Sequence, residues 1–208
     1  MTIRLQEVHP SLVHYPIAFL PLAIGADAIG KVTGSRTMLA TGKLGIALTA
    51  ATGALAGVFG LIAQEEVELR DDRAGDILVT HRTLNMGFVA LATAMAVVRM
   101  RRRKPSLRYL ATGLASIGAV AYSAYLGGKM VYDHGVGVDA AGGIAPGHGP
   151  ELRWDRAEEV TEHAIEDARL GVRHAVETMA QGNLVPALRG GREARATSMP
   201  RAADGPQP

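Results

Sequence analysis

The 208-residue sequence contains no cysteine. Disulfide bonds, thiolate-held iron–sulfur clusters and the Cys-x-x-Cys-His attachment of c-type haem are therefore excluded. Any cofactor has to be held by histidine, methionine or carboxylate side chains. The sequence also lacks a nucleophile–base pair, a phosphate-binding loop and a nucleic-acid-binding surface. We therefore expect neither an enzyme that acts on its own nor a nucleic-acid partner.

Charge is absent from two long stretches of the chain. Residues 44–63 and 109–128 contain no Asp, Glu, Lys or Arg, and each has about the twenty residues needed to cross a hydrocarbon layer roughly 30 Å thick. Residues 12–29 and 77–98 contain one charged residue each. A soluble helix needs a polar face along its whole length, which residues 44–63 lack. The sequence predicts an all-α protein whose four-helix transmembrane bundle lies in a lipid bilayer.

Acidic residues are absent from two of the three loops between the predicted spans. The loop after the third span contains six Lys or Arg and the loop after the first contains three, neither with an acid. The loop after the second span contains six Asp or Glu against two Arg. Because Lys and Arg are retained on the cytoplasmic side, the acidic loop faces outward. We expect a multi-pass protein of the bacterial inner membrane with both termini outside.

Small residues recur at every fourth position in the second and fourth predicted spans. This spacing places each set on one helix face, where small side chains let two backbones approach closely in lipid. We therefore expect the second and fourth spans to pack tightly against each other. The positions are Thr41, Gly45, Thr49, Gly53 and Gly57 in the second span and Ala111, Ala115, Ala119, Ser123 and Gly127 in the fourth.

The chain beyond the fourth span changes in composition. A transmembrane domain at residues 1–139 is followed by a Gly-rich linker at 140–150, a soluble amphipathic helix at 151–181 and a disordered tail at 182–208. The helix could dock on the bundle, on another protein or on the membrane surface. Its apolar positions at helical spacing are Ile165, Ala168, Val172, Val176 and Met179.

Four of the seven histidines fall at the outer ends of predicted spans, although they are far apart in the sequence. Ionisable groups near membrane depth are costly without a partner, so their gathering at one membrane face indicates a function. Neutral imidazole binds haem iron, zinc and copper, and its ordinary pKa also suits proton transfer. The four residues are His9, His14, His81 and His134.

A cofactor site competes here with structural hydrogen bonding and with proton handling. A b-type haem would lie toward the first and third spans, away from the small-residue stripes, with His14 and His81 as its axial ligands. A single zinc, copper or iron ion would use the same pair. His9, His134 or Glu65 would then complete the shell of that ion.

Two polar residues within the spans add to this picture. Asn85 follows His81 by about one helical turn and could orient its ring. Asp27 lies about 20 Å deeper than His14 at 1.5 Å per residue, near the inner boundary. We expect Asp27 to pair with Lys31 one turn later, the alternative being a proton path. Ion or proton transport is weakly supported, because broken helices and repeats are lacking.

Two motifs resemble those of the bacterial membrane domain-of-unknown-function family 2231. The opening run His9-Pro10-Ser11-Leu12-Val13-His14-Tyr15-Pro16-Ile17 is similar to the family pattern His-Pro-x-x-Val-His-Phe-Pro-Ile. Tyr15 stands where Phe is usual and adds a hydroxyl near the histidines. Asp27, the pair of His81 and Asn85, and a closing run from Gly127 to Val138 resemble later motifs. The similarity covers about residues 8–139.

The resemblance implies a four-helix membrane protein without an assigned reaction. Some members are associated with Rieske-type iron–sulfur domains, which implies electron transfer with a Rieske-like or cytochrome partner. This chain cannot hold a Rieske centre itself, because it has no cysteine. We therefore expect a protein that binds haem b or a metal and transfers electrons, and that could form a homo-oligomer. The alternative is a non-catalytic scaffold or assembly factor whose outer C-terminal helix recruits a partner.

Overall fold

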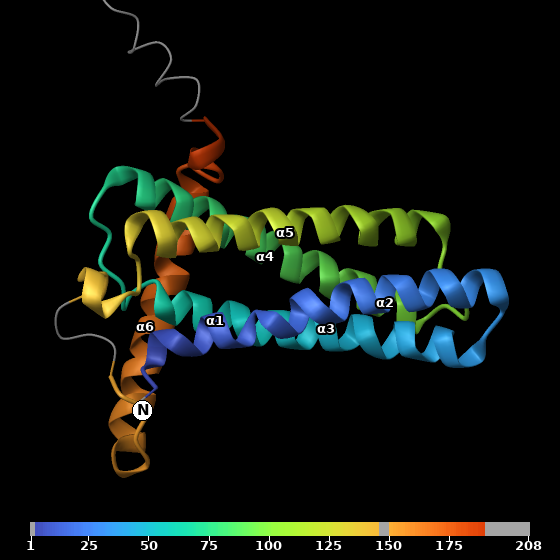
Figure 1. The fold of residues 1–208 in the computed structure, drawn as a ribbon, viewed down its shortest axis with the longest axis horizontal. Helices are drawn as coiled ribbons and strands as arrows, with labels where there is room; N and C mark the ends of the chain where they lie inside the picture. The colour runs from blue at the N-terminus through green and yellow to red at the C-terminus, as the bar shows by residue number, and fades with distance from the viewer. Residues whose placement is uncertain (1–2, 146–149, 190–208) are drawn as a thin grey trace, which may run out of the picture.

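The computed structural model describes residues 3–145 and 150–189 (Figure 1). Four long helices lie side by side in this described part, and each is long and apolar enough to cross a membrane. They are α2 (His14–Thr33), α3 (Arg36–Ala63), α4 (Asp72–Met100) and α5 (Leu107–His134). The short helix α1 (Val8–Leu12) precedes α2, and α6 (Ala157–Ala180) crosses one end of the bundle. The predicted all-α membrane fold with a following helix is confirmed.

Helices α3, α4 and α5 each begin at a side-chain cap. Ser35, Asp71 and Ser106 accept a hydrogen bond from the backbone N–H three residues later, at 3.3, 2.8 and 3.1 Å. Each bond satisfies a donor that the helix start leaves without an intrahelical partner. Helices α2 and α5 end at Gly34 and Gly135, whose φ angles of 73° and 66° lie in the left-handed region that glycine adopts without steric cost.

The bundle is a ring in which α2 packs on α3 and α5, and α4 packs on the same two helices (Figure 1). Helices α3 and α5, both fully described, therefore lie diagonally opposite, and the predicted tight contact between them is wrong. Within the stripe of α3, a Cβ on Gly45 would lie 2.8 Å from the Cβ of Ala23 in α2, whereas Gly57 lies against α4. Ala111 and Ala115 of α5 are exposed. Because α5 carries small residues around most of its circumference, a spacing of four did not identify its buried face.

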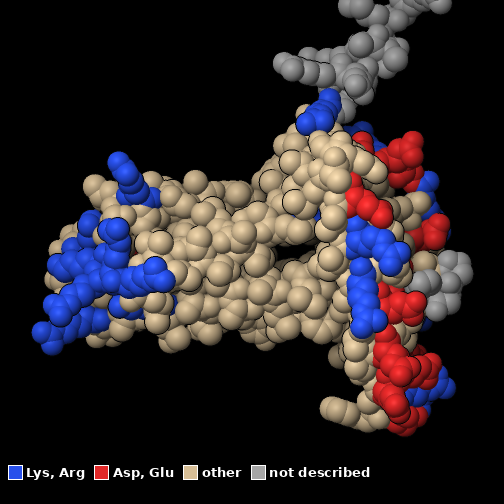
Figure 2. Space-filling view, turned by 180° about the vertical axis from the view of Figure 1, so that it is seen from behind, with Lys and Arg blue, Asp and Glu red and all other residues tan. Residues whose placement is uncertain are grey.

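Charged side chains gather at the two ends of the bundle on the face that Figure 2 shows. One end shows only Lys and Arg, whereas the end that carries α6 shows both signs. Between them the surface exposes large apolar side chains, including Leu22, Leu55 and Leu114. A soluble protein rarely exposes so long an apolar belt, and this is the surface that a bundle presents to lipid.

The segment between α5 and α6 is held to the bundle in its described part, in contrast to the predicted flexible linker. The Ala145 N–H donates to the Glu66 carbonyl at 3.0 Å, and the Glu68 N–H donates to the Gly143 carbonyl at 3.1 Å. Such backbone bonds fix a segment that a free linker would leave to solvent. Three segments far apart in the sequence, the N-terminus, the α3–α4 loop and the residues after α5, thus meet at one end of the bundle.

Helix α6 docks on the ends of α3 and α4. A Cβ on Gly171 would overlap the carbonyl group of Leu61, so the two backbones are in close contact. Gln64 Nε2 donates to the Gly171 carbonyl at 3.3 Å, and Arg82 Nη2 donates to Thr178 Oγ1 at 2.8 Å. The predicted apolar positions Ile165, Val172, Val176 and Met179 are nevertheless exposed.

The helix begins at Ala157, after a 3₁₀ turn at Trp154–Arg156, rather than at residue 151. The chain directly after α6 is also held to the bundle, where disorder was predicted from residue 182. The Ala187 N–H donates to Thr80 Oγ1 of α4 at 3.0 Å, which holds the chain after α6 to the bundle. The rest of the predicted tail, residues 190–208, lies outside the described residues.

Candidate functional site

His9 and His81 come together inside the half of the bundle that carries α6. Their ring centroids are 6.3 Å apart and the ring planes are nearly perpendicular, at 89°. His9 Nδ1 lies 2.9 Å from the Ala56 carbonyl of α3, and His81 Nδ1 lies 2.9 Å from the Ser123 carbonyl of α5. Helices α1, α3, α4 and α5 therefore all contribute to the position of this histidine pair.

The hydrogen bonds define the state of both rings. A carbonyl oxygen can only accept, so Nδ1 carries the proton in His9 and in His81. The amide of Asn85 lies 3.0 Å from His81 Nε2, and its nitrogen is the donor that a neutral ring accepts there. His81 is therefore held as the neutral Nδ1–H form, with its in-plane lone pair at Nε2. The Asn85 amide therefore contacts the His81 ring directly.

Two glycines make room for the rings. A Cβ on Gly60 of α3 would lie 3.0 Å from His9 Cε1, and a Cβ on Gly127 of α5 would lie 3.3 Å from His81 Cε1. Both distances are shorter than ordinary van der Waals contact. Gly127 belongs to the small-residue stripe expected from the sequence, but it faces an imidazole rather than a helix backbone. Gly60 was missed, because nothing local in the sequence links it to His9.

The comparison with protein families covers this bundle. A family model described as predicted membrane protein, DUF2231, matches residues 6–140. The chain belongs to this family. The match includes every span of the bundle and ends before α6 begins. Neither a curated protein nor a solved structure matches the chain.

Other residues of the DUF2231 domain that the sequence singled out lie apart from the histidine pair. His14 is exposed, and its Nδ1 lies 3.4 Å from the Ser11 carbonyl one turn earlier. Tyr15 is exposed as well, with its ring 6.2 Å from that of Phe19. The structure thus brings His81 together with His9, whereas His14 and Tyr15 lie on the outside of the bundle.

His134 and Glu65 each have a separate partner at the end of the bundle that carries α6. His134 Nδ1 lies 2.9 Å from Asp71 Oδ2, and Glu65 Oε1 lies 2.9 Å from His174 Nδ1 of α6. The pKa of Asp71 lies below its usual value, chiefly because the Ala74 N–H donates to its carboxylate, with the His134 hydrogen bond adding to the effect. These contacts join the start of α4 to the end of α5, and the loop after α3 to α6.

Asp27 pairs with Arg99 of α4 and not with Lys31, so the predicted local pair is wrong. Arg99 Nε and Nη2 donate to the two carboxylate oxygens at 2.7 and 2.6 Å, and both side chains are buried. Lys31 Nζ instead donates to the Pro105 carbonyl at 2.9 Å. The Asp27–Arg99 pair therefore joins α2 to α4 at the end opposite the histidine pair.

A second group of ligand-type side chains was not identified from the sequence. Glu66 Oε1 lies 3.0 Å from His163 Nε2, and Asp167 Oδ2 lies 3.3 Å from the same nitrogen. Among the described residues, these three form the group of His, Asp and Glu close enough to share a metal ion. The spacing of four between His163 and Asp167 places both on one face of α6 and was the one available signal.

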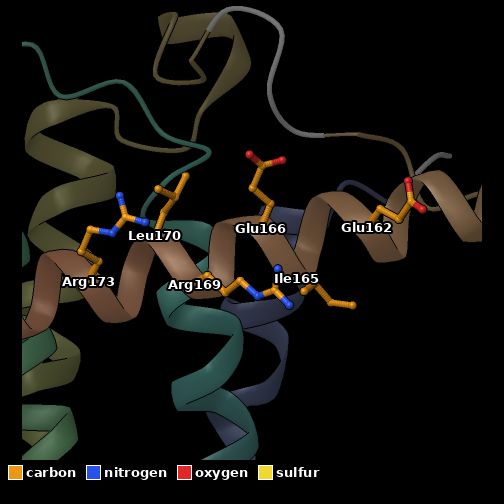
Figure 3. A pocket seen from close by; sticks show the side chains of 6 residues that line it. All are labelled: Glu162, Ile165, Glu166, Arg169, Leu170 and Arg173. Carbon is orange, nitrogen blue, oxygen red and sulfur yellow. The ribbon is translucent and has the colours of Figure 1, made fainter.

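The exposed side of α6 carries only a shallow hollow (Figure 3). Its lining comes from α6 alone, and Glu162 and Glu166 point to one side of the helix while Ile165 and Arg169 point to another. Side chains that diverge from a single helix cannot converge on a ligand. This hollow therefore adds nothing to the candidate site.

Proposed function

We propose that this DUF2231 protein is an electron-transfer protein of the bacterial inner membrane that binds haem b between His9 and His81. The observation that carries the proposal is the perpendicular, half-buried imidazole pair inside a membrane bundle. Both rings donate Nδ1–H to a backbone carbonyl, the arrangement by which proteins fix metal-binding imidazoles and leave Nε2 for the metal.

The separation of the rings fits a shared metal. An imidazole nitrogen lies about 2 Å from a bound metal and the ring centre roughly 1 Å behind it, which places two ring centres about 6 Å apart. The His9 and His81 centroids are 6.3 Å apart. Figure 2 also shows an opening between the helix pairs in the half of the bundle nearest α6. Binding would exchange the Asn85 hydrogen bond at His81 Nε2 for a bond to iron.

A haem suits this pair better than a single zinc, copper or iron ion does. Among the described residues, no other His, Asp or Glu joins His9 and His81 in a group that could share an ion. A lone ion would therefore have two protein ligands, fewer than the three or four of ordinary zinc sites. A porphyrin supplies its own equatorial nitrogens and needs only the two imidazoles.

His9 and His81 would hold the haem between them, and a haem held by two histidines would supply one-electron transfer rather than oxygen chemistry. The resemblance to a family with Rieske-associated members supports a Rieske-like or cytochrome partner. The distribution of Lys and Arg supports a partner on the outside, because the end that shows only Lys and Arg (Figure 2) would face the cytoplasm. The histidine pair and α6 would then lie toward the outer face, together with both termini.

An optical spectrum of the purified full chain tests this proposal. We expect a Soret band and a reduced-minus-oxidised α-band in the wild type, and the loss of both in His9→Ala and in His81→Ala. His14→Ala is the matched control, because His14 lies five residues after His9 in the same N-terminal helical segment but is exposed, and it should keep the spectrum. A wild-type protein from haem-replete cells that shows no Soret band contradicts the proposal.

A second candidate is a non-catalytic scaffold or assembly factor whose α6 recruits a partner. The exposed Ile165, Val172, Val176 and Met179 favour it, because an unpaired apolar stripe is a common docking surface. In that case deletion of residues 151–181 abolishes function in cells, whereas His9→Ala and His81→Ala preserve it. The haem proposal predicts that the two histidine variants lose function.

A further inference from the structure

We propose that Glu66, His163 and Asp167 form a binding site for a divalent transition-metal ion that clamps α6 onto the bundle. Glu66 lies in the loop after α3, and the other two lie on α6. Their ligand atoms all lie within 4.8 Å of one another. The site is separate from the histidine pair and does not depend on haem binding.

The two distances from His163 to the carboxylates are close to the edges of a coordination shell. Ligand atoms about 2.0–2.2 Å from a tetrahedral ion are roughly 3.4 Å from one another. His163 Nε2 lies 3.0 Å from Glu66 Oε1 and 3.3 Å from Asp167 Oδ2. The three ligand atoms all lie within 4.8 Å of one another, so rotations of these side chains could bring them around one ion.

Burial makes this group different from an ordinary surface ion pair. The Glu66 and Asp167 side chains are 0% and 3% exposed, and that of His163 is 30% exposed. Two carboxylates brought together away from water repel each other and lose hydration. A divalent cation offsets both costs, and the partial exposure of His163 gives the ion a path from solvent.

The backbone around the site is fixed by contacts that do not involve it. Gly171 lies against the backbone of Leu61, and Arg82 bonds Thr178. His163 and Asp167, four residues apart, project from one face of the docked helix toward Glu66. The ligands are therefore preorganised, which a metal site needs in order to bind in preference to water.

The donor set selects the class of ion. One imidazole and two carboxylates are too nitrogen-rich for Mg²⁺ or Ca²⁺, which prefer all-oxygen shells, and suit Zn²⁺, Fe²⁺ or Mn²⁺. Three protein ligands leave a position for water on a four-coordinate ion. Because the family match ends at residue 140, the site needs α6 in addition to the DUF2231 domain.

Calorimetric titration of Zn²⁺ into the chelator-treated full chain in detergent tests the proposal. We expect one equivalent to bind, and Glu66→Gln and Asp167→Asn each to weaken binding by roughly 10- to 100-fold or more, since even residues that only support ligands have effects of that size. Glu65→Gln and His174→Gln are the matched controls. They form the neighbouring contact between the loop and α6, with the same residue types at 2.9 Å, and should leave binding unchanged.

Hydrogen exchange of the wild type separates binding from folding. Zn²⁺ should slow amide exchange in α6 of the wild type but not in Asp167→Asn. The circular dichroism spectrum of Asp167→Asn should match that of the wild type, which shows that the variant is folded. The proposal is overturned if Zn²⁺ binding is absent, or if Glu66→Gln and Glu65→Gln weaken it equally. His9→Ala should keep Zn²⁺ binding, so failure of the haem proposal is distinguishable from failure of this one.

Discussion

At the scale of single residues, the buried ion pair between Asp27 and Arg99 depends on a glycine. The pair is bidentate, and both side chains are at most 1% exposed. A buried carboxylate and guanidinium lose hydration, and the loss is offset only when the geometry is good. Gly42 of α3 lies directly against the carboxylate, and a Cβ there would overlap its oxygens. The close approach of α3 to this pair therefore requires glycine.

Gly42→Ala should destabilise the bundle because the methyl group forces the Asp27 carboxylate away from Arg99. Breaking a buried ion pair costs about 3–5 kcal/mol, so we expect a large fall in the midpoint of thermal unfolding in detergent. Gly25→Ala is the control, since a Cβ at Gly25 has nothing within 4 Å and alanine is the better helix former. Equal stability of the two variants would show that the pair tolerates displacement.

The sequence predicted the depth of Asp27 but not its partner. Neighbours four residues apart on a helix can be inferred from spacing alone, which is why Lys31 was expected. Arg99 is 72 residues away, and its approach depends on the rotation of α4 about its axis. The sequence of an apolar span with small residues on several sides does not indicate which face of the helix is turned inward, so this rotation could not be predicted.

At the scale of elements, helix rotation also explains which histidines meet. His9 and His14 are five residues apart, which is about 140° around a helix of 3.6 residues per turn. Both cannot face the interior, and His9 is the one that reaches the Ala56 carbonyl. The predicted span began at residue 12, whereas helical structure already begins with Leu5–Glu7 and continues through α1. The loops predicted that the histidines lie at the end of the bundle that carries the acidic loop, but they did not predict which two rings meet there.

The start of α4 should respond to pH through Asp71. The pKa of Asp71 is lower than in an unfolded chain, chiefly because of the Ala74 N–H. A group of this kind stabilises the fold above its unfolded pKa, about 3.9, and the contribution is lost as pH falls through the lower folded pKa. We expect Asp71→Asn to unfold at a lower temperature than the wild type at neutral pH, with the difference shrinking below about pH 4.

The matched variant for this experiment is Asp72→Asn. It removes an acidic charge at the next position, but Asp72 is the first residue of α4 rather than its cap. Thermal unfolding of the wild type and both variants in one detergent, across that pH range, separates the cap from net charge. The assignment to Asp71 fails if Asp72→Asn shows the same pH-dependent difference.

At the scale of the whole molecule, composition determined what could be predicted. Four spans and a separate helix followed from long uncharged runs and from helical spacing, because a bilayer tolerates few other patterns. The layer at the α6 end could not be predicted in the same way. It joins the N-terminus, the α3–α4 loop and the chain after α5 through single backbone bonds such as Leu5 N–H to the Pro150 carbonyl, at 3.1 Å. Bonds of this kind leave no periodic signal in the sequence.

The absence of cysteine makes the orientation in the membrane directly testable. Glu177 lies on α6 and Arg103 in the loop between α4 and α5, and both are exposed. If Lys and Arg mark the cytoplasmic side, Glu177→Cys should react with a membrane-impermeant maleimide in intact spheroplasts. Arg103→Cys should react only after the membrane is broken. Each variant carries a single thiol, so neither signal needs correction for other cysteines.

The opposite labelling pattern would mean that the protein has the opposite orientation in the membrane. Helix α6 and its metal ligands would then face the cytoplasm, and an electron partner would have to approach His9 and His81 from that side. The internal geometry would be unchanged, because the distances between these residues do not depend on orientation. Labelling therefore decides which compartment supplies the partner and the metal ion, and it does so independently of whether either one binds.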